Sequence, residues 1–222
     1  MHGLGDLETY DYGMWSAALV GIGIFVFFVL SYLKPKKRWE WHSMGTYSAF
    51  VVALFTEMYG FPLTIYILTS VLGSQYPVLN PFSHINGHLW VVLAGGSTIV
   101  WVIVMVVSNV VMFGGLVIMG RAWKQVHRAD GELVTTGLYR WVRHPQYSAL
   151  FLITVGMLIQ WPTLVTAAMW PVLMFMYYRL ARREEKEMGT RFGDKYISYS
   201  KRVPMFLPKL ASAGAVSGLE VQ

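Results

Sequence analysis

The sequence predicts an all-α, polytopic membrane protein with about five transmembrane helices, the last two forming a C-terminal hairpin. Two observations favour this fold class. Of the 222 residues, 55% are hydrophobic and only 14% are charged, whereas a soluble domain carries about 25% charged residues. Charges are also nearly absent from four long regions, each of which reaches the roughly 20 residues that a helix needs to cross a bilayer. These regions are 14–33, 43–73, 89–119 and 148–178.

The last apolar region divides at Pro162, because the residue before a proline is biased away from the helical conformation. We therefore expect two short membrane segments, 148–160 and 163–178, that form a hairpin. Both are short for full spans, and a re-entrant hairpin would leave the same topology. We expect residues 1–210 to form one membrane domain and residues 211–222 to form a flexible tail.

The basic residues predict the orientation of the chain. All 18 Lys and Arg fall in 34–38, 121–143 and 179–209, which lie on one side of the membrane if the N-terminus is outside. The positive-inside rule makes that side cytoplasmic. We therefore expect a cytoplasmic C-terminus and a basic face against lipid headgroups. This placement of the charges excludes nucleic acid as a partner, and the absence of cysteine excludes a catalytic thiol.

Glu57 is the one acidic residue inside an apolar region. An intramembrane carboxylate is a candidate functional residue, and it is equally well explained as a group that ties two helices together. Gly60 and Pro62 predict a kink or break in this segment. His84 and His88 are four residues apart, but they have no third ligand nearby in the sequence, so we expect no metal site.

A dense polar and aromatic block lies at 137–147, with the sequence Gly-Leu-Tyr-Arg-Trp-Val-Arg-His-Pro-Gln-Tyr. Pro145 suits the first turn of the following helix. Arg143 and His144 then lie at the helix entrance, where free N–H groups and the positive dipole end attract a carboxylate. Arginine and tyrosine also anchor proteins at membrane interfaces, so the spacing alone leaves open whether this block binds a ligand.

A second polar block follows the hairpin at 179–208. Its arginines, paired glutamates and tyrosines fit a solvated helix with i, i+4 ion pairs. The hairpin also returns this block to the membrane side where block 137–147 lies. We therefore expect carboxylates, arginines and tyrosines from both blocks to converge at the cytoplasmic mouth of the membrane domain.

In order and spacing, the two blocks resemble the isoprenylcysteine carboxyl methyltransferase family and its phospholipid N-methyltransferase relatives. The shared pattern is Gly-x-Tyr, Arg-His-Pro-x-Tyr, a membrane hairpin, paired glutamates, Phe-Gly, two tyrosines and Val-Pro. The resemblance covers the chain from residue 137 to residue 208, whereas the N-terminal half matches only as generic membrane helices. Ala149 departs from the pattern, because the family often has glycine there.

The resemblance implies S-adenosylmethionine as the methyl donor, in a pocket that a cytoplasmic C-terminal helix closes. The sequence shows no glycine-rich Rossmann fingerprint, so a soluble-type methyltransferase fold is not indicated. Motif position, together with the helix entrance at Arg143, predicts the cofactor-binding residues. They are Tyr139, Arg143, His144, Pro145, Tyr147, Glu184, Glu185, Tyr196 and Tyr199.

The implied reaction is methyl transfer to a lipophilic acceptor from the bilayer, with the carboxylate of an isoprenylcysteine as the first choice. We expect Arg179, and after it Arg183, to hold such a carboxylate. For a phospholipid amine or a lipophilic thiol, the predicted bases are Glu57, Glu184 and Glu185.

Two other functions stay open from the sequence. A sterol-reductase-like enzyme with a nicotinamide cofactor ranks lower, because the short loops leave little room for that larger cofactor. A small membrane transporter or scaffold would explain Glu57 but not the two ordered polar blocks. The oligomeric state is not predicted.

Overall fold

The computed structural model describes residues 10–33, 38–72, 82–129 and 131–209, and all regular structure within them is helical. The predicted all-α class is therefore confirmed for this part of the chain. Two predictions lie outside the described residues: the flexible tail 211–222 and the contribution of Lys34, Lys36 and Lys37 to the basic face.

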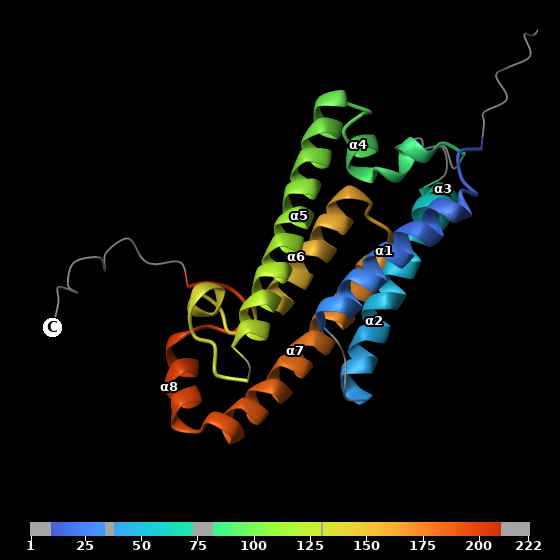
Figure 1. The fold of residues 1–222 in the computed structure, drawn as a ribbon. Helices are drawn as coiled ribbons and strands as arrows, with labels where there is room; N and C mark the ends of the chain where they lie inside the picture. Colours follow the sequence, from blue (N-terminus) through green and yellow to red (C-terminus); the bar gives the residue numbers. More distant parts are fainter. Residues whose placement is uncertain (1–9, 34–37, 73–81, 130, 210–222) are drawn as a thin grey trace, which may run out of the picture.

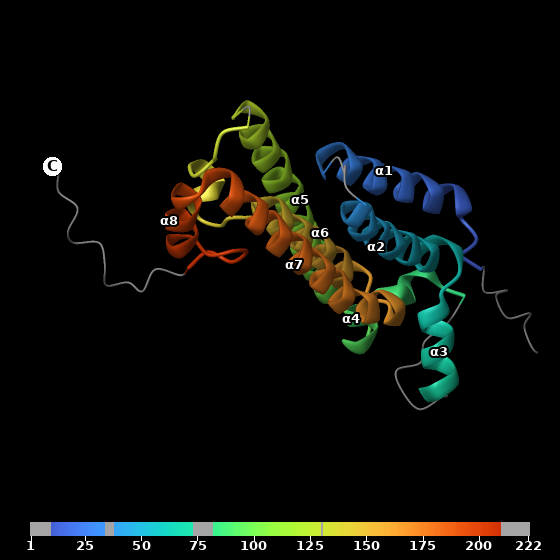
Figure 2. The same cartoon turned by 90° about the horizontal axis from the view of Figure 1, so that it is seen from below.

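The N-terminal half contains two long helices and one short bent helix. Helix α1 spans Trp15–Leu33, and α2 spans Arg38–Phe55 beside it (Figure 2). A π-helical turn, Thr56–Gly60, follows α2, and α3, Leu63–Leu72, then leaves at an angle of 70°. The predicted break near Gly60 and Pro62 is confirmed, because Pro62 cannot continue the hydrogen-bonding of a helix.

The third apolar region differs from the prediction of one long helix. It forms a short helix α4, Leu89–Leu93, and a separate helix α5, Thr98–Arg128. Gly95 and Gly96 interrupt the helix because both adopt left-handed backbone conformations, with φ of +68° and +76°. The basic stretch 121–128 forms the end of α5.

The predicted C-terminal hairpin is confirmed (Figure 1). Helix α6 spans Pro145–Gln160 and α7 spans Leu164–Phe192. The second arm is longer than expected, since α7 continues without a break from the apolar region into the polar block. Gly193, with a φ of +52°, then turns the chain into α8, Asp194–Arg202.

Within the described residues, three helices, α1, α5 and α7, are long and apolar enough to cross a membrane. The bent pair of α2 with its π-helical turn and α3 adds a fourth if it forms one span. Helix α6 is apolar but has only 16 residues. The structure therefore supports three or four spans by length and composition, and the fifth span and the cytoplasmic C-terminus stay predictions.

Two glycines allow α5 and α6 to pack with their backbones close together. A Cβ atom on Gly115 of α5 would come within 2.8 Å of the Ala149 carbonyl oxygen. A Cβ atom on Gly156 of α6 would come within 2.9 Å of the Ser108 carbonyl oxygen. Small residues permit this kind of approach between membrane helices, and it holds the start of α6 beside the end of α5.

We predict that Gly115→Ala destabilises the protein by about 1–3 kcal/mol, the usual cost of overpacking a core. The added methyl group meets backbone atoms, which cannot move away as a side chain can. Gly114→Ala is the matched control, because a Cβ atom there meets nothing within 4 Å. Thermal unfolding in detergent should show a lower midpoint for Gly115→Ala alone. Equal midpoints for the two variants would contradict the close packing.

Candidate active site

The two polar blocks meet around one cavity, which we call the polar pocket. Its volume is about 290 Å³. It lies where the end of α5, the start of α6, the polar part of α7 and the helix α8 come together (Figure 1). Six of the predicted site residues line it: Tyr139, Arg143, His144, Glu184, Tyr196 and Tyr199.

A 3₁₀ turn, Gly137–Arg140, carries Tyr139 into the pocket. Gly137 has a φ of +60°, and the Leu138 N–H donates to Gln125 Oε1 on α5 at 3.2 Å. The buried Tyr139 hydroxyl donates to Gln146 Oε1 at 3.1 Å. The turn is therefore fixed to both α5 and α6.

The C-terminal strap, residues 203–206, fixes the entrance of α6. The backbone N–H groups of Arg143 and His144 donate to the carbonyls of Pro204 and Met205 at 2.8 and 3.0 Å. The Ser148 hydroxyl donates to the Phe206 carbonyl at 2.6 Å. Pro145 begins α6 as predicted. These backbone partners lie about sixty positions further along the chain, which is why the sequence does not reveal them.

An ionic cluster lies beside the pocket. Arg143 Nη2 is 2.7 Å from Glu185 Oε1. The His144 ring lies between two carboxylates, with Nδ1 at 3.4 Å from Glu184 Oε2 and Nε2 at 3.5 Å from Glu185 Oε1. The Tyr147 hydroxyl donates to Glu184 Oε1. Tyr147 and Glu185 do not line the pocket. Through these contacts they hold Arg143, His144 and Glu184, which do line it.

These contacts determine the charge of the cluster. Burial disfavours the imidazolium of His144, but the contacts with Glu184 and Glu185 outweigh burial and raise its pKa. Burial also disfavours the carboxylate of Glu185, but His144, Arg143 and Arg182 together lower its pKa. The surroundings therefore favour a positively charged His144 and a negatively charged Glu185.

The shifted pKa values of His144 and Glu185 predict a pH range in which the ionic cluster stabilises the folded protein most. The raised pKa of His144 contributes stability that is complete below its ordinary value of 6.5 and is lost as pH rises through the folded-state value. The lowered pKa of Glu185 contributes stability that is complete above 4.5 and is lost as pH falls. The difference in unfolding midpoint between the wild type and His144→Gln should therefore be largest between pH 4.5 and 6.5. A difference that does not vary with pH would contradict this charge state.

Helix α8 closes the pocket through buried tyrosines. The Tyr199 hydroxyl donates to the Tyr139 carbonyl at 2.6 Å, and burial raises the pKa of Tyr199 to about 12. Tyr196 is also buried, and its pKa is raised chiefly by burial. Arg143 Nη1 donates to the Ser200 carbonyl. Both tyrosines therefore stay neutral at physiological pH, and α8 is fixed directly to the entrance of α6.

The pocket also contains residues that the sequence did not single out. Glu132, Met188, Arg191 and Phe192 line it, and Arg191 Nη2 donates to the Gly131 carbonyl at 2.7 Å across one edge. Arg191 and Glu132 could not be found from the sequence, because no spacing connects the α5–α6 loop with the end of α7. Phe192 was visible only as part of the Phe-Gly motif.

The donor set of the pocket fits S-adenosylmethionine. Arg143 Nε is buried and has no hydrogen-bond partner within the described residues, and His144 Nε2 has only the ion-pair contact with Glu185 at 3.5 Å. Both groups can therefore donate to a ligand carboxylate. Glu132 and Glu184 offer acceptors for an amine and ribose hydroxyls. Phe192, Tyr196 and Met188 add apolar and aromatic surface, which suits an adenine ring and a sulfonium cation.

The structure does not bring Arg179 and Arg183 into the polar pocket. Both line a separate cavity of about 300 Å³ between α2 and α7, the α2–α7 pocket, together with His42, Ser43 and Thr46. The Arg179 guanidinium lies 5.6 Å from the Phe175 ring centroid on the same helix. The two arginines and Glu184 therefore lie on different faces of α7.

Glu57 is also far from the pocket. Its Oε2 accepts from the Thr64 N–H at 2.8 Å, and the Thr64 hydroxyl accepts from the Leu164 N–H at 2.9 Å. Leu164 is in the first turn of α7, and Glu184 lies about 30 Å further along that helix at the usual rise of about 1.5 Å per residue. Glu57 therefore ties the π-helical turn to α3, and Thr64 ties α3 to α7. Within the described residues, no group of three His, Asp or Glu side chains could hold a metal ion.

The long apolar helices within the described residues indicate an integral membrane protein, with a helical hairpin and a polar pocket at one end of it. Residues 101–190 match the model of the Isoprenylcysteine carboxyl methyltransferase (ICMT) family. The predicted resemblance is therefore confirmed. The matched range contains α5, α6 and most of α7, whereas α8 and the C-terminal strap lie beyond it.

Relatives with assigned names match parts of the chain. The protein-S-isoprenylcysteine O-methyltransferase of Mus musculus is 35% identical over 78 residues, which cover 34% of this chain and 27% of that protein. Protein-S-isoprenylcysteine O-methyltransferase B of Arabidopsis thaliana is 25% identical over 57% of this chain and 64% of that protein. The nickel-cobalt-cadmium resistance protein NccN of Alcaligenes xylosoxydans xylosoxydans is 31% identical over 42% of this chain and 45% of that protein. No solved structure is significantly similar to the chain.

Proposed function

We propose that the protein is a membrane-embedded methyltransferase that uses S-adenosylmethionine and acts on a lipophilic acceptor. One observation carries this proposal: two blocks that are separated by a membrane hairpin in the sequence line one polar pocket. The match of residues 101–190 to the model of the ICMT family supports the reaction class. Because the match covers only 27% of the mouse enzyme, the activity of the whole chain is an inference.

In this proposal each group in the polar pocket has a defined task. When bound, S-adenosylmethionine supplies an electrophilic methyl group on a sulfonium. Arg143 and His144 bind the carboxylate of the ligand, while Glu132 and Glu184 accept hydrogen bonds from its amine and ribose. Tyr196, Tyr199 and the rest of α8 exclude water. A site held by such fixed groups lowers the barrier mainly by alignment and by preorganised electrostatics.

The acceptor we infer first is the carboxylate of an isoprenylcysteine, in agreement with the printed names of the mouse and Arabidopsis relatives. A phospholipid amine or a lipophilic thiol is the alternative. Arg179 and Arg183, which line the α2–α7 pocket, remain the predicted holders of an acceptor carboxylate. This role requires the acceptor to reach from the α2–α7 pocket to the methyl donor in the polar pocket. If Arg179 holds the acceptor and not the donor, Arg179→Gln should raise the KM for the acceptor and leave S-adenosylhomocysteine affinity unchanged.

The test uses the purified protein, S-adenosylmethionine with a tritiated methyl group, and three acceptors. These are an N-acylated S-prenylcysteine, phosphatidylethanolamine and a long-chain alkyl thiol. Base releases the methyl group of an ester as volatile methanol but does not release N- or S-methyl groups. We expect base-labile label on the prenylcysteine. Base-stable label on either other acceptor would select the alternative, and no transfer to any acceptor would contradict the proposed acceptor class.

We further propose that residues 1–210 form one membrane domain with an external N-terminus and a cytoplasmic polar pocket. The chain contains no cysteine, so single cysteines can report the topology. Lys195 on α8 and Ile85 near the other end of the bundle are both exposed. In intact cells, a membrane-impermeant maleimide should label Ile85→Cys, and it should label Lys195→Cys only after permeabilisation. The reverse pattern would overturn the orientation.

A further inference from the structure

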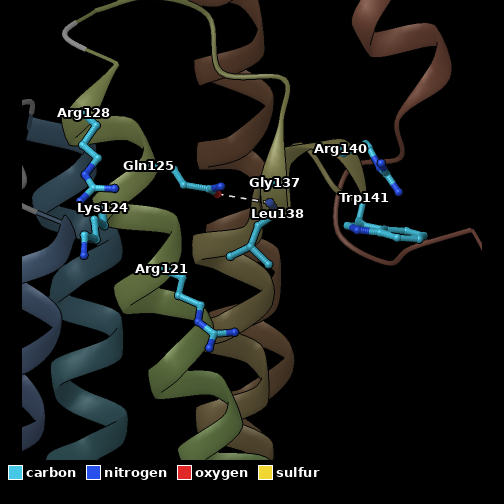
Figure 3. Close-up of a pocket in the computed structure, with 8 residues that line it drawn as sticks. All are labelled: Arg121, Lys124, Gln125, Arg128, Gly137, Leu138, Arg140 and Trp141. Carbon is cyan, nitrogen blue, oxygen red and sulfur yellow. Dashed lines mark hydrogen bonds between the residues drawn. The ribbon is translucent and has the colours of Figure 1, made fainter.

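A second cavity, which we call the basic pocket, lies between the last turns of α5 and the 3₁₀ turn Gly137–Arg140. It has a volume of about 530 Å³. Figure 3 shows three of its cations on α5 and Arg140, beside Trp141, on the 3₁₀ turn. The four cations, all exposed, are Arg121, Lys124, Arg128 and Arg140. No Asp or Glu lines the pocket, and none of the four forms an ion pair within the described residues.

The walls of the basic pocket are held in place. The hydrogen bond between the Leu138 N–H and Gln125 Oε1, drawn in Figure 3, joins the 3₁₀ turn to α5. Gly137 has a φ of +60°, which favours glycine, and a Cβ atom there would displace the Gln125 amide that bonds the turn. Tyr139 on the same turn lines the polar pocket instead. The turn therefore separates two cavities, and the proposed methyl transfer uses none of the four cations.

An apolar stripe leads along α5 into the basic pocket. Val106, Val110, Phe113 and Val117 are each at least half exposed. Their spacing of three or four residues places them on one face of the helix, and the same spacing continues through Arg121, Lys124 and Arg128. One face of α5 is thus apolar for three turns and then basic for two. This order matches the acyl chains and the phosphate of a phospholipid.

We propose that the basic pocket binds the phosphate of an anionic phospholipid whose acyl chains lie along the exposed stripe of α5. Arginine side chains bind phosphate oxygens in a bidentate manner, and basic residues at a membrane surface attract anionic lipids. A free phosphate compound would pair with the same cations, but it would leave the apolar stripe uncovered. For this reason the structure favours a lipid over a soluble anion. The proposal does not depend on the methyltransferase activity.

The test titrates the full-length protein, in an uncharged detergent, with short-chain lipids and counts bound lipid by native mass spectrometry. The probes are dioctanoyl-phosphatidylglycerol, dioctanoyl-phosphatidylcholine with the same chains, and glycerol 3-phosphate without chains. We expect phosphatidylglycerol to bind at least tenfold more tightly than either comparison compound. Equal binding of the two lipids would overturn the charge argument, and equal binding of glycerol 3-phosphate would show that the ligand is a soluble phosphate.

Paired variants locate the site. Arg121→Gln with Lys124→Gln should weaken phosphatidylglycerol binding about tenfold to thirtyfold, the usual effect of two cations near a lipid surface. Lys186→Gln with Lys195→Gln removes the same charge from α7 and α8 and should leave binding unchanged. Arg128→Gln alone should give a smaller loss in the same direction. If both double variants lose the same affinity, the lipid responds to net charge only and the pocket assignment fails.

Discussion

Replacing His144 with alanine is expected to weaken S-adenosylhomocysteine binding by about a hundredfold or more. The imidazolium lies between Glu184 and Glu185, at 3.4 and 3.5 Å from their oxygens. Its removal leaves the two carboxylates without the cation between them, and it removes the buried Nε2 donor, which makes no hydrogen bond within the described residues. Losing a charged hydrogen-bonding group from a buried site costs about 3 kcal/mol, and each 1.4 kcal/mol is a factor of ten in affinity.

Equilibrium dialysis with radiolabelled S-adenosylhomocysteine measures this loss. Glu184→Gln should lower the affinity in the same way, because it removes the charge opposite His144 and weakens the bond from the Tyr147 hydroxyl. The matched controls are His127→Ala and Glu187→Gln, which change exposed residues outside the polar pocket. Full affinity in both His144→Ala and Glu184→Gln, with folded protein, would remove these residues from the proposed binding site.

Replacing Arg143 with methionine is expected to destabilise the protein by about 3 kcal/mol and to release α8. The Arg143 and Glu185 side chains are only 13% and 11% exposed. Removing one partner of a buried ion pair leaves the other charge unpaired, at a cost of about 3–5 kcal/mol. Arg143 also donates to the Ser200 carbonyl, which is one of the bonds that fix α8 to the entrance of α6.

Arg182→Met provides the comparison, because Arg182 approaches the same carboxylate, Glu185, at 3.5 Å but is 57% exposed. An exposed pair of this kind contributes between about 0 and 1 kcal/mol. Thermal unfolding midpoints and the rate of proteolysis within α8 should change strongly in Arg143→Met and little in Arg182→Met. Equal changes in the two variants would mean that burial of the Arg143–Glu185 pair does not stabilise the C-terminal helix.

The positions of proline and glycine in the sequence predicted much of the fold. Pro162 indicated the hairpin turn, Pro145 indicated the start of α6, and Gly60 with Pro62 indicated the break before α3. The errors arose where two apolar helices follow each other without a change in composition. Gly95 and Gly96 lie inside the apolar region 89–119, where both adopt positive φ and divide α4 from α5.

Part of the site was predictable from the side chains in the motifs of the two polar blocks. His144, Tyr139 and Glu184 were expected together and do line one pocket. The strap carbonyls and Arg191 were not predictable, because backbone partners and residues at the end of a long helix leave no local signal. Arg179 and Glu184 are five residues apart on one helix, so the rotation between them directs the arginine toward α2 and the glutamate toward α6.

The central claim is that the polar pocket is a site for S-adenosylmethionine. Calorimetric titration of the unmodified, detergent-purified protein tests it most directly, with S-adenosylhomocysteine in one experiment and a reduced nicotinamide dinucleotide in another. We predict one S-adenosylhomocysteine per chain, bound with micromolar affinity, and no heat from the nicotinamide cofactor. Binding of the dinucleotide without binding of S-adenosylhomocysteine, in protein shown to be folded, would contradict the proposed methyltransferase and favour a reductase.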